Sequence, residues 1–399
     1  MSEKTEKKGI LSFLPKSAVK LTVKNSIISA IAILVVAAAI TVYLAMTFTS
    51  MWKADTFYPG EGVTQITKLS QWYPKLANTK GDTDVYILEG AEPGDTLLVL
   101  GGTHANEPAG VLSAVYLLEN LKPTKGKVII IPQVNVAGFT CTDPQEAAPM
   151  TYTISADGME RTFRYGSRAT NPIYQWPDPD IYVHASSGQQ LSGSETRNLN
   201  RAYPGRETGT FTESIAYAVT ELIKAENAVM SIDLHEASPE YPNINSVVAH
   251  ENAAETAAYA KLDLEIEGVP INLENSPKTL HGLTHRELGD FTDTLALLME
   301  TSNPAQGRLR GATNEHLVIT GQDKYYFRAG TYGRLYVPFT EEGHPIAQRV
   351  ARHVTAIHAL VSAYNEQGKG SGIDMGELPS YDDLCANLYS YLVAPTKAN

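Results

Sequence analysis

The feature that most constrains this chain is the stretch from Asn25 to Trp52, which contains no charged side chain. It is longer than the roughly 20 apolar residues that a helix needs to cross a bilayer. Six lysines and only two glutamates stand within the first 24 residues. Because positively charged flanks tend to remain in the cytoplasm, the sequence predicts a single membrane helix at residues 25–52 that contacts lipid. Residues 1–24 would then be cytoplasmic and the rest of the chain extracytoplasmic.

A cleavable signal peptide is the alternative interpretation of this stretch. Signal peptides usually have a shorter apolar region, followed by a cleavage site of small residues. The residues from Phe48 to Trp52 offer no such site, and Trp52 with Lys53 is typical of a membrane-interface anchor. The pattern therefore favours a retained signal-anchor in the cell membrane.

The composition of the remainder of the chain is typical of an acidic globular protein. The whole chain of 399 residues has a net charge of −12, which disfavours binding to nucleic acid. With only Cys141 and Cys385, neither a cysteine-rich metal cluster nor a disulfide scaffold is available. These two residues could form one disulfide outside the cytoplasm, or remain two inert thiols.

Apolar runs and helical periodicity alternate after about residue 95, which is typical of an α/β fold. Predicted strands include Thr96–Leu100, Lys127–Ile131, Ala228–Ile232 and Leu295–Met299, and predicted helices lie near residues 106–121, 212–226 and 346–365. A proline-rich and aromatic segment at about 140–195 interrupts this pattern and is interpreted as an insertion around a site. The predicted organisation is a basic tail (1–24), a membrane helix (25–52), a lead-in (53–94), a main domain (95–367) and a C-terminal tail (368–399).

Two potential metal ligands follow the strand Thr96–Leu100. Gly101 and Gly102 permit a tight turn, and Pro108 is tolerated in the first turn of the next helix. His104 and Glu107 lie between them, three residues apart, so their side chains can share one face. An imidazole and a carboxylate are two of the three protein ligands that a catalytic zinc takes.

The best candidate for the third ligand is His235, at the end of a strand that contains Asp233. Alternation along the strand places Asp233 and His235 on one face, where the carboxylate can accept the spare imidazole N–H. Glu236 faces the other way, and we interpret it as a solvated or capping residue.

Two further candidates concern catalysis and substrate binding. Glu300 ends the strand Leu295–Met299, and ligands of α/β sheets bind beyond the carboxyl ends of parallel strands. Because it is not needed as a metal ligand, it is a candidate general acid/base. Arg201 offers a planar fork that suits a carboxylate, and Asn200 beside it can add a hydrogen bond.

Four motifs together resemble the succinylglutamate desuccinylase/aspartoacylase family of zinc carboxypeptidase-like hydrolases. They are Gly101–Glu107, Asn198–Pro204, Asp233–His235, and Met299–Glu300 followed by Asn303–Arg310. The resemblance implies a central, mixed but mostly parallel sheet flanked by helices. It also implies one zinc ion bound by His104, Glu107 and His235, with Glu300 as general acid/base and Asn200 with Arg201 on a substrate carboxylate.

The sequence departs from the family's motifs at two positions. Asn198 replaces the usual aspartate of the Asp-Leu-Asn-Arg motif, and Ala105 replaces the glycine that usually follows the first histidine. Neither change removes a ligand or the base, but Asn198 alters the charge beside the expected carboxylate site.

Such enzymes also use an arginine to polarise the scissile carbonyl. Arg161, Arg164, Arg168 and Arg197 are candidates, and the sequence slightly favours Arg164. Tyr332 is either a mobile substrate contact or, more in keeping with an ordinary tyrosine, a solvent-facing or packing residue.

These features predict a membrane-anchored zinc hydrolase that cleaves an amide bond in a small molecule or peptide carrying a free carboxylate. A deacylase of N-acyl amino acids is the expectation from the family. A carboxypeptidase acting on extracellular or cell-wall peptides is the alternative enzyme. A surface binding protein without catalysis is the alternative of another class, although it would have no need to retain His104, Glu107, His235 and Glu300 together.

Overall fold

The computed structural model describes residues 23–143, 146–156 and 159–395 of the chain. They form two compact units, which meet in the sequence between Ser50 and Met51. The first unit is represented by the helix α1 (Val23–Ser50). Apart from its last two residues, the predicted basic tail at 1–24 lies outside the described residues.

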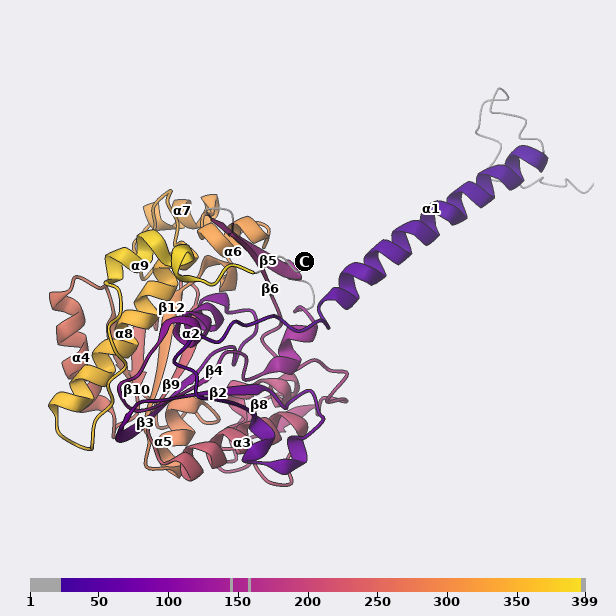
Figure 1. The fold of residues 1–399 in the computed structure, drawn as a ribbon. Helices are drawn as coiled ribbons and strands as arrows, with labels where there is room; N and C mark the ends of the chain where they lie inside the picture. The colour runs from indigo at the N-terminus through magenta and orange to yellow at the C-terminus, as the bar shows by residue number, and fades with distance from the viewer. Residues whose placement is uncertain (1–22, 144–145, 157–158, 396–399) are drawn as a thin grey trace, which may run out of the picture. The chain divides into compact units, whose positions relative to one another are not determined.

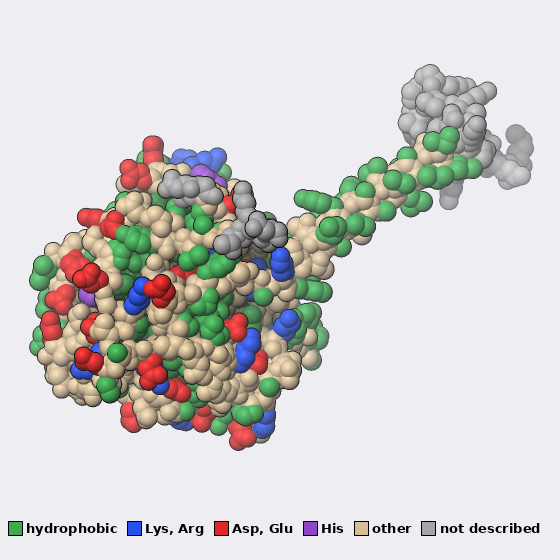
Figure 2. All heavy atoms as spheres, in the orientation of Figure 1, with side chains coloured by type: hydrophobic (Ala, Val, Ile, Leu, Met, Phe, Trp, Pro, Cys, Tyr) green, Lys and Arg blue, Asp and Glu red, His purple; other side chains and the backbone are tan. Residues whose placement is uncertain are grey.

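Helix α1 by itself has the length and composition of a membrane span or a signal sequence. Within Ser26–Ser50 the most apolar window of 18 residues has a mean hydropathy of 2.7, and apolar side chains cover the helix in Figure 2. The hydroxyl groups of Thr41 and Thr47 donate hydrogen bonds to the carbonyl oxygens of Ala37 and Tyr43 in the preceding turn, at 2.8 and 2.9 Å. These two hydroxyl groups therefore have partners within the helix, as an apolar environment requires.

The second unit is built on one sheet, which has eight strands within the described residues, in the order β1-β2-β4-β3-β9-β12-β10-β11. Its central strands β4, β3, β9 and β12 are mutually parallel, whereas β2 and β10 pair antiparallel with this block. This arrangement confirms the mixed, mostly parallel α/β sheet that the sequence predicted. The strands are β1 (Gln65–Lys68), β2 (Asp84–Glu89), β3 (Glu92–Leu100), β4 (Lys125–Ile131), β9 (Ala228–Ala237), β10 (Ser246–Ala249), β11 (Asn272–Asn275) and β12 (Leu295–Ser302).

Helices cover both faces of this sheet (Figure 1). Because successive side chains of a strand point to opposite faces, Leu97 and Val99 enter one core cluster while Leu98 and Leu100 enter the other. Helices α2, α4, α8 and α9 pack on the first side and α3 on the second. The helices of this unit are α2 (Pro108–Asn120), α3 (Phe211–Glu226), α4 (Ala254–Ile266), α5 (Gly289–Phe291), α6 (Glu315–Thr320), α7 (Lys324–Thr331), α8 (Ile346–Glu366) and α9 (Tyr381–Asn387).

Local sequence explains where α3 begins and ends. Thr210 and Glu213 form a reciprocal capping box at its start, which satisfies two backbone N–H groups that lack helical partners. Asn227 ends the helix in the left-handed conformation, with φ of 49°. The chain then turns directly into β9, which carries Asp233 and His235.

The segment predicted as an irregular insertion contains two small hairpins. Strands β5 (Thr151–Ala156) and β6 (Met159–Arg164) pair antiparallel, as do β7 (Ile181–Val183) and β8 (Gln190–Ser192). Cys141, which lies at the start of this segment, and Cys385 are both free thiols. Burial raises the pKa of Cys141 to about 11, in keeping with an inert thiol.

Candidate metal centre and catalytic site

The carboxyl ends of β3, β9 and β12 meet at one edge of the sheet and deliver the predicted ligands there. After β3 the chain turns through Gly102, whose φ is +66°. A side chain at Gly102 would also meet the ring of Phe139 at 2.9 Å, so only glycine fits this turn. Pro108 then opens α2, leaving His104 and Glu107 in the short connection between strand and helix.

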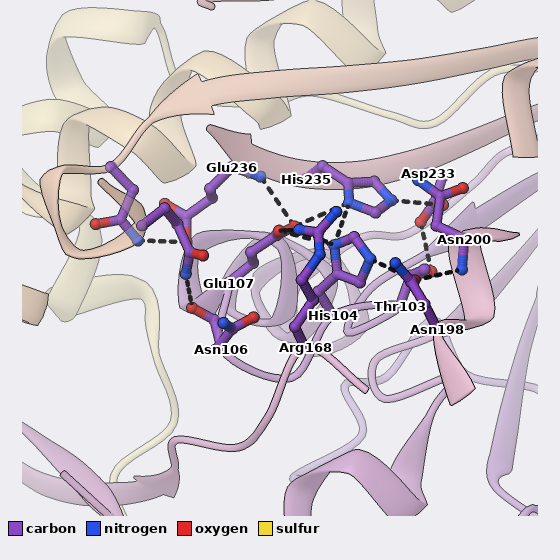
Figure 3. A network of polar contacts seen from close by, with 12 residues as sticks. Thr103, His104, Asn106, Glu107, Arg168, Asn198, Asn200, Asp233, His235 and Glu236 are labelled. Carbon is purple, nitrogen blue, oxygen red and sulfur yellow. Dashed lines mark hydrogen bonds and ion pairs between the residues drawn. The ribbon is translucent and has the colours of Figure 1, made fainter. Parts of the chain in front are cut away.

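His104, Glu107 and His235 converge in one buried cluster (Figure 3). The Nδ1 atom of His104 lies 2.8 Å from Oε1 of Glu107, and Nδ1 of His235 lies 2.8 Å from Oε2 of the same carboxylate. The two Nδ1 atoms are 3.1 Å apart. Each of the three side chains is at most 2% exposed, so the cluster is shielded from bulk solvent.

Hydrogen bonds on the far side of each imidazole fix its tautomer. Nε2 of His235 lies 2.7 Å from Oδ2 of Asp233, and Nε2 of His104 lies 2.9 Å from Oδ1 of Asn198. The amide nitrogen of Asn198 donates to Glu195, which leaves its oxygen facing His104. Since both partners are acceptors, each Nε2 carries a proton, and in the neutral ring Nδ1 is then the atom that can bind a metal.

Two imidazole Nδ1 atoms and a carboxylate therefore face one another in a buried space, where one cation can bind all three. The donor set of two histidines and one glutamate is the one found in several catalytic zinc sites. Carboxylate and amide partners on the outer nitrogens are typical of metal-binding histidines. The residues present thus fit a single divalent metal ion, and Asn198 takes the role of orienting His104.

Asp233 is itself held by two hydroxyl groups. Thr103 donates to its Oδ1 at 2.8 Å, and Thr284 donates to its Oδ2 at 2.9 Å. We expect Asp233→Asn to lower metal affinity by about 10-fold to 100-fold, because the amide orients His235 less firmly and makes it a poorer donor. Competition with a chromophoric chelator measures the change, and an unaltered affinity would exclude a role for Asp233 in holding the ligand.

The electrostatics of the cluster also suit a metal ligand set. Burial, reinforced by the charge of Arg168, lowers the pKa of His104 to about 4, so this imidazole is neutral at physiological pH. Burial alone would raise the pKa of Glu107, but the adjacent His104 and His235 hold it below its ordinary value. Glu107 is therefore ionised and His104 neutral, the states in which both bind a metal. Burial alone would lower the pKa of His235, but Asp233 and Glu107 raise it well above its ordinary value, so metal binding displaces a proton from this imidazole.

Glu300 lies next to the cluster, paired in register with His235 across the parallel strands β9 and β12. It lines the adjoining cavity, and its Oε2 atom has no hydrogen-bond partner within the described residues. Burial raises the pKa of Glu300 to about 8. A carboxyl group with an unengaged oxygen and a raised proton affinity is suited to proton transfer.

The cavity beside these residues measures about 810 Å³. Asn200 and Arg201 line it, both from the short helix η6 (Leu199–Arg201). The backbone N–H of Thr284 donates to Oδ1 of Asn200 at 3.0 Å, which leaves the amide nitrogen of Asn200 for other partners. Arg201 donates one N–H to the carbonyl oxygen of Asn200, and its Nε atom lies 3.8 Å from Oε2 of Glu195. Most of its guanidinium donors therefore remain available.

The structure does not bring Arg164, the favoured arginine, into this cavity. Its guanidinium pairs with Asp55 at 2.9 Å and donates to Met51 and Gln133, so its polar contacts are satisfied elsewhere. Arg161 likewise pairs with Glu119, and Arg197 with Asp178.

Arg168 is the one of the four candidate arginines that lines the cavity. Its Nη1 atom lies 3.5 Å from Oε1 of Glu107, and its side chain is 43% exposed (Figure 3). The residue follows β6 in a loop that is tied to the metal-binding turn, since the backbone N–H of Gly166 donates to the carbonyl oxygen of Ala105 at 3.1 Å. This tertiary contact and the pairing of Arg164 with Asp55 distinguish the two arginines, and no local sequence pattern encodes either of them.

The structure also places Tyr332 and Glu236, two residues for which the sequence set expectations. Tyr332 is 65% exposed and does not line the cavity, as expected for a solvent-facing tyrosine. Glu236 is not solvated: its carboxylate is buried, pairs with Arg349 at 2.5 Å and accepts the N–H of Ala109 in the first turn of α2. Its backbone N–H also donates to Oε2 of Glu107, at 3.1 Å.

This chain is similar to known proteins in structure rather than in sequence. No family model and no curated protein matches the sequence. A succinylglutamate desuccinylase from Silicibacter sp. TM1040 is similar in structure at a TM-score of 0.42 and 14% identity, covering 75% of this chain and 63% of that one. For a succinylglutamate desuccinylase/aspartoacylase from Rhodobacter sphaeroides the TM-score is 0.34 and the identity 19%, covering 55% of this chain and 51% of that one.

A metallo-carboxypeptidase from Burkholderia cenocepacia has a TM-score of 0.43 and 11% identity to this chain, covering 77% of it. The alignment covers 66% of that carboxypeptidase, so this chain spans less than two thirds of each of the three similar structures. The structural neighbours of the chain are thus members of the succinylglutamate desuccinylase/aspartoacylase family and a metallo-carboxypeptidase.

Proposed function

We propose that this protein is a zinc-dependent hydrolase that removes an acyl group from a carboxylate-bearing amine by cleaving the amide bond. The observation that carries the proposal is the convergence of two imidazole Nδ1 atoms and one carboxylate beside Glu300, whose Oε2 atom has no partner among the described residues. Asn200 and Arg201, which both have unused hydrogen-bond donors, line the same cavity.

His104, Glu107 and His235 would hold the metal through two nitrogens and a carboxylate. When bound there, zinc supplies Lewis-acid activation of a carbonyl and lowers the pKa of water. Glu300 takes the proton from the attacking water and returns it to the nitrogen of the leaving amine. The bond that breaks is the amide C–N bond, and the products are an acid and an amine.

The two arginines of the cavity divide the remaining tasks. Arg168, close to His104 and Glu107, donates to the carbonyl oxygen as negative charge develops on it. Arg201 and Asn200 hold the free carboxylate of the substrate, through charge-assisted hydrogen bonds that fix the amide beside Glu300.

A metallocarboxypeptidase acting on peptides or cell-wall peptides is the second candidate. The size of the cavity, about 810 Å³, favours it, because this lies toward the upper end of the volumes usual for small-molecule sites. In a peptide, the same Arg201 would hold the C-terminal carboxylate.

Screening the zinc-loaded, full-length protein in detergent against N-acyl amino acids and short peptides separates these candidates. Release of the acyl acid supports the deacylase, and release of a C-terminal residue supports the carboxypeptidase. A chelator should abolish either reaction, and amidating the substrate's carboxylate should strongly reduce it, because Arg201 then lacks a charged partner. Turnover that withstands the chelator would contradict a metal-dependent reaction.

We further propose that α1 is a retained membrane anchor that leaves the second unit outside the cytoplasm. The uncharged stretch from Asn25 to Trp52 and the lysine-rich sequence before it support this topology. A cysteine introduced at the exposed Glu267 should react with a membrane-impermeant thiol reagent in intact cells, above the background of the parent chain. Reaction only after permeabilisation would reverse the proposed orientation.

A further inference from the structure

A π-helical turn, η7 (Thr284–Leu288), forms part of the cavity wall and connects its two functional regions. The backbone N–H of Thr284 holds Asn200, and its hydroxyl holds Asp233. Turns of this kind occur frequently at functional sites. The next residue, His285, therefore stands beside the proposed carboxylate-binding pair, and the proposed reaction gives it no role.

His285 is only 4% exposed and lines the cavity. Its Nδ1 atom lies 2.8 Å from the hydroxyl oxygen of Ser276. Arg286 approaches the same oxygen at 3.5 Å, and a guanidinium can only donate. The hydroxyl hydrogen of Ser276 thus points to Nδ1 of His285, which places the ring proton on Nε2.

The Nε2–H group of His285 has no hydrogen-bond partner within the part of the chain that the structure describes. Burial lowers the pKa of His285 to about 3, so the ring is neutral at physiological pH. His285 therefore presents one neutral N–H donor to the cavity. Such a donor recognises an oxygen acceptor but does not neutralise a charge.

Aliphatic side chains form much of the cavity wall in this region, and Arg286, which approaches Ser276, is already paired with Asp290 and Glu251. Five aliphatic residues of this region line the cavity, namely Val248, Pro277, Leu280, Leu283 and Leu298. Val248 and Leu298 are paired in register on β10 and β12, and Pro277 follows Ser276 in the chain. A carboxylate placed here would lose its hydration for a single neutral hydrogen bond, whereas a carboxamide would lose far less.

We propose that His285 determines substrate specificity by donating from Nε2 to an uncharged oxygen acceptor on the side chain of the carboxylate-bearing moiety. The substrate class is an N-acyl amino acid, or a peptide ending in one, with a carboxamide side chain of the glutamine type. Aliphatic side chains leave the N–H unpaired, acidic ones are desolvated while Arg201 is engaged by the neighbouring carboxylate, and basic ones bring a second donor to the N–H. This inference rests on the proposed function, because it assumes that Arg201 holds the neighbouring carboxylate.

Three substrates and two variants of the zinc-loaded, full-length protein in detergent test the proposal. The kcat/KM for an N-acyl glutamine should exceed that for the N-acyl norleucine by about 10-fold to 100-fold, the effect of leaving a buried donor unpaired. It should also exceed that for the N-acyl glutamate. In His285→Leu the glutamine–norleucine preference should fall to within about 3-fold, whereas His285→Gln, which keeps a neutral N–H near the position of Nε2, should retain most of it.

Binding of free glutamine and norleucine, measured by calorimetry on the same proteins, provides a readout that needs no turnover. If wild type turns over its substrates and His285→Leu keeps the full glutamine preference, His285 is not the determinant although the hydrolase stands. If no substrate is turned over but wild type binds glutamine more tightly than norleucine in a way that depends on His285, the specificity proposal stands and the proposed reaction falls. Absence of both turnover and discrimination in binding overturns both, and an unchanged zinc content in the variants shows that the metal site is intact.

Discussion

Replacing Glu300 with glutamine should reduce kcat by between about 100-fold and 10,000-fold while the protein keeps its metal. The reason is that Glu300 lies beside the ligand cluster, paired in register with His235, but is not one of the three converging ligands. Glutamine has nearly the same shape and cannot accept the proton of the attacking water. Steady-state kinetics on the full-length protein, with zinc content measured on the same samples, checks both parts of this expectation.

The matched control is Glu267→Gln, the same chemical change at an exposed position after α4. It should leave kcat and zinc content near those of wild type. Turnover of Glu300→Gln within a few-fold of wild type would show that another group moves the proton, and loss of zinc from this variant would make Glu300 a ligand.

Replacing Arg349 with methionine should lower the free energy of unfolding by about 3–5 kcal/mol. Arg349 in α8 and Glu236 in β9 form an ion pair in which neither side chain is exposed to solvent. Arg349 also donates to the carbonyl oxygen of Val318. Removing the guanidinium leaves the buried carboxylate of Glu236 without a counter-charge. An unpaired buried charge is strongly destabilising.

Chemical denaturation in detergent, followed by a signal from the second unit, measures this loss. The double variant Glu236→Gln with Arg349→Met should recover part of it, since the uncompensated charge is then absent. Because Glu236 contacts both Glu107 and the start of α2, we also expect the single variant to bind zinc more weakly. A loss below about 1 kcal/mol would mean that water or another cation reaches Glu236 readily.

The central part of the site was predictable because short-range rules govern it. The apolar run before Gly101 predicts the strand β3, and the glycine pair and Pro108 predict the turn that presents His104 and Glu107. Alternation along β9 placed Asp233 on the same face as His235, and their hydrogen bond agrees with it.

Residues whose environment depends on distant segments could not be predicted in this way. The same alternation places Glu236 on the opposite face, but only the packing of α8 shows that Arg349 meets it there. Arg164 and Arg168 are four positions apart, and the choice between them depends on Asp55, more than a hundred residues earlier. The sequence alone predicts only that Asn198 alters the charge beside the carboxylate site. In the structure its side-chain oxygen accepts a hydrogen bond from His104 and so orients that imidazole.

The metal content of the full-length protein is the most direct test of the proposed metal centre. After purification in detergent with zinc supplied and excess removed, wild type should contain about one zinc ion per chain, the stoichiometry of a single three-ligand site. His235→Ala should contain almost none and show no turnover, because it lacks one ligand of the cluster. A wild-type protein that retains no stoichiometric divalent metal, or a His235→Ala protein that retains it fully, would contradict the proposed metal centre.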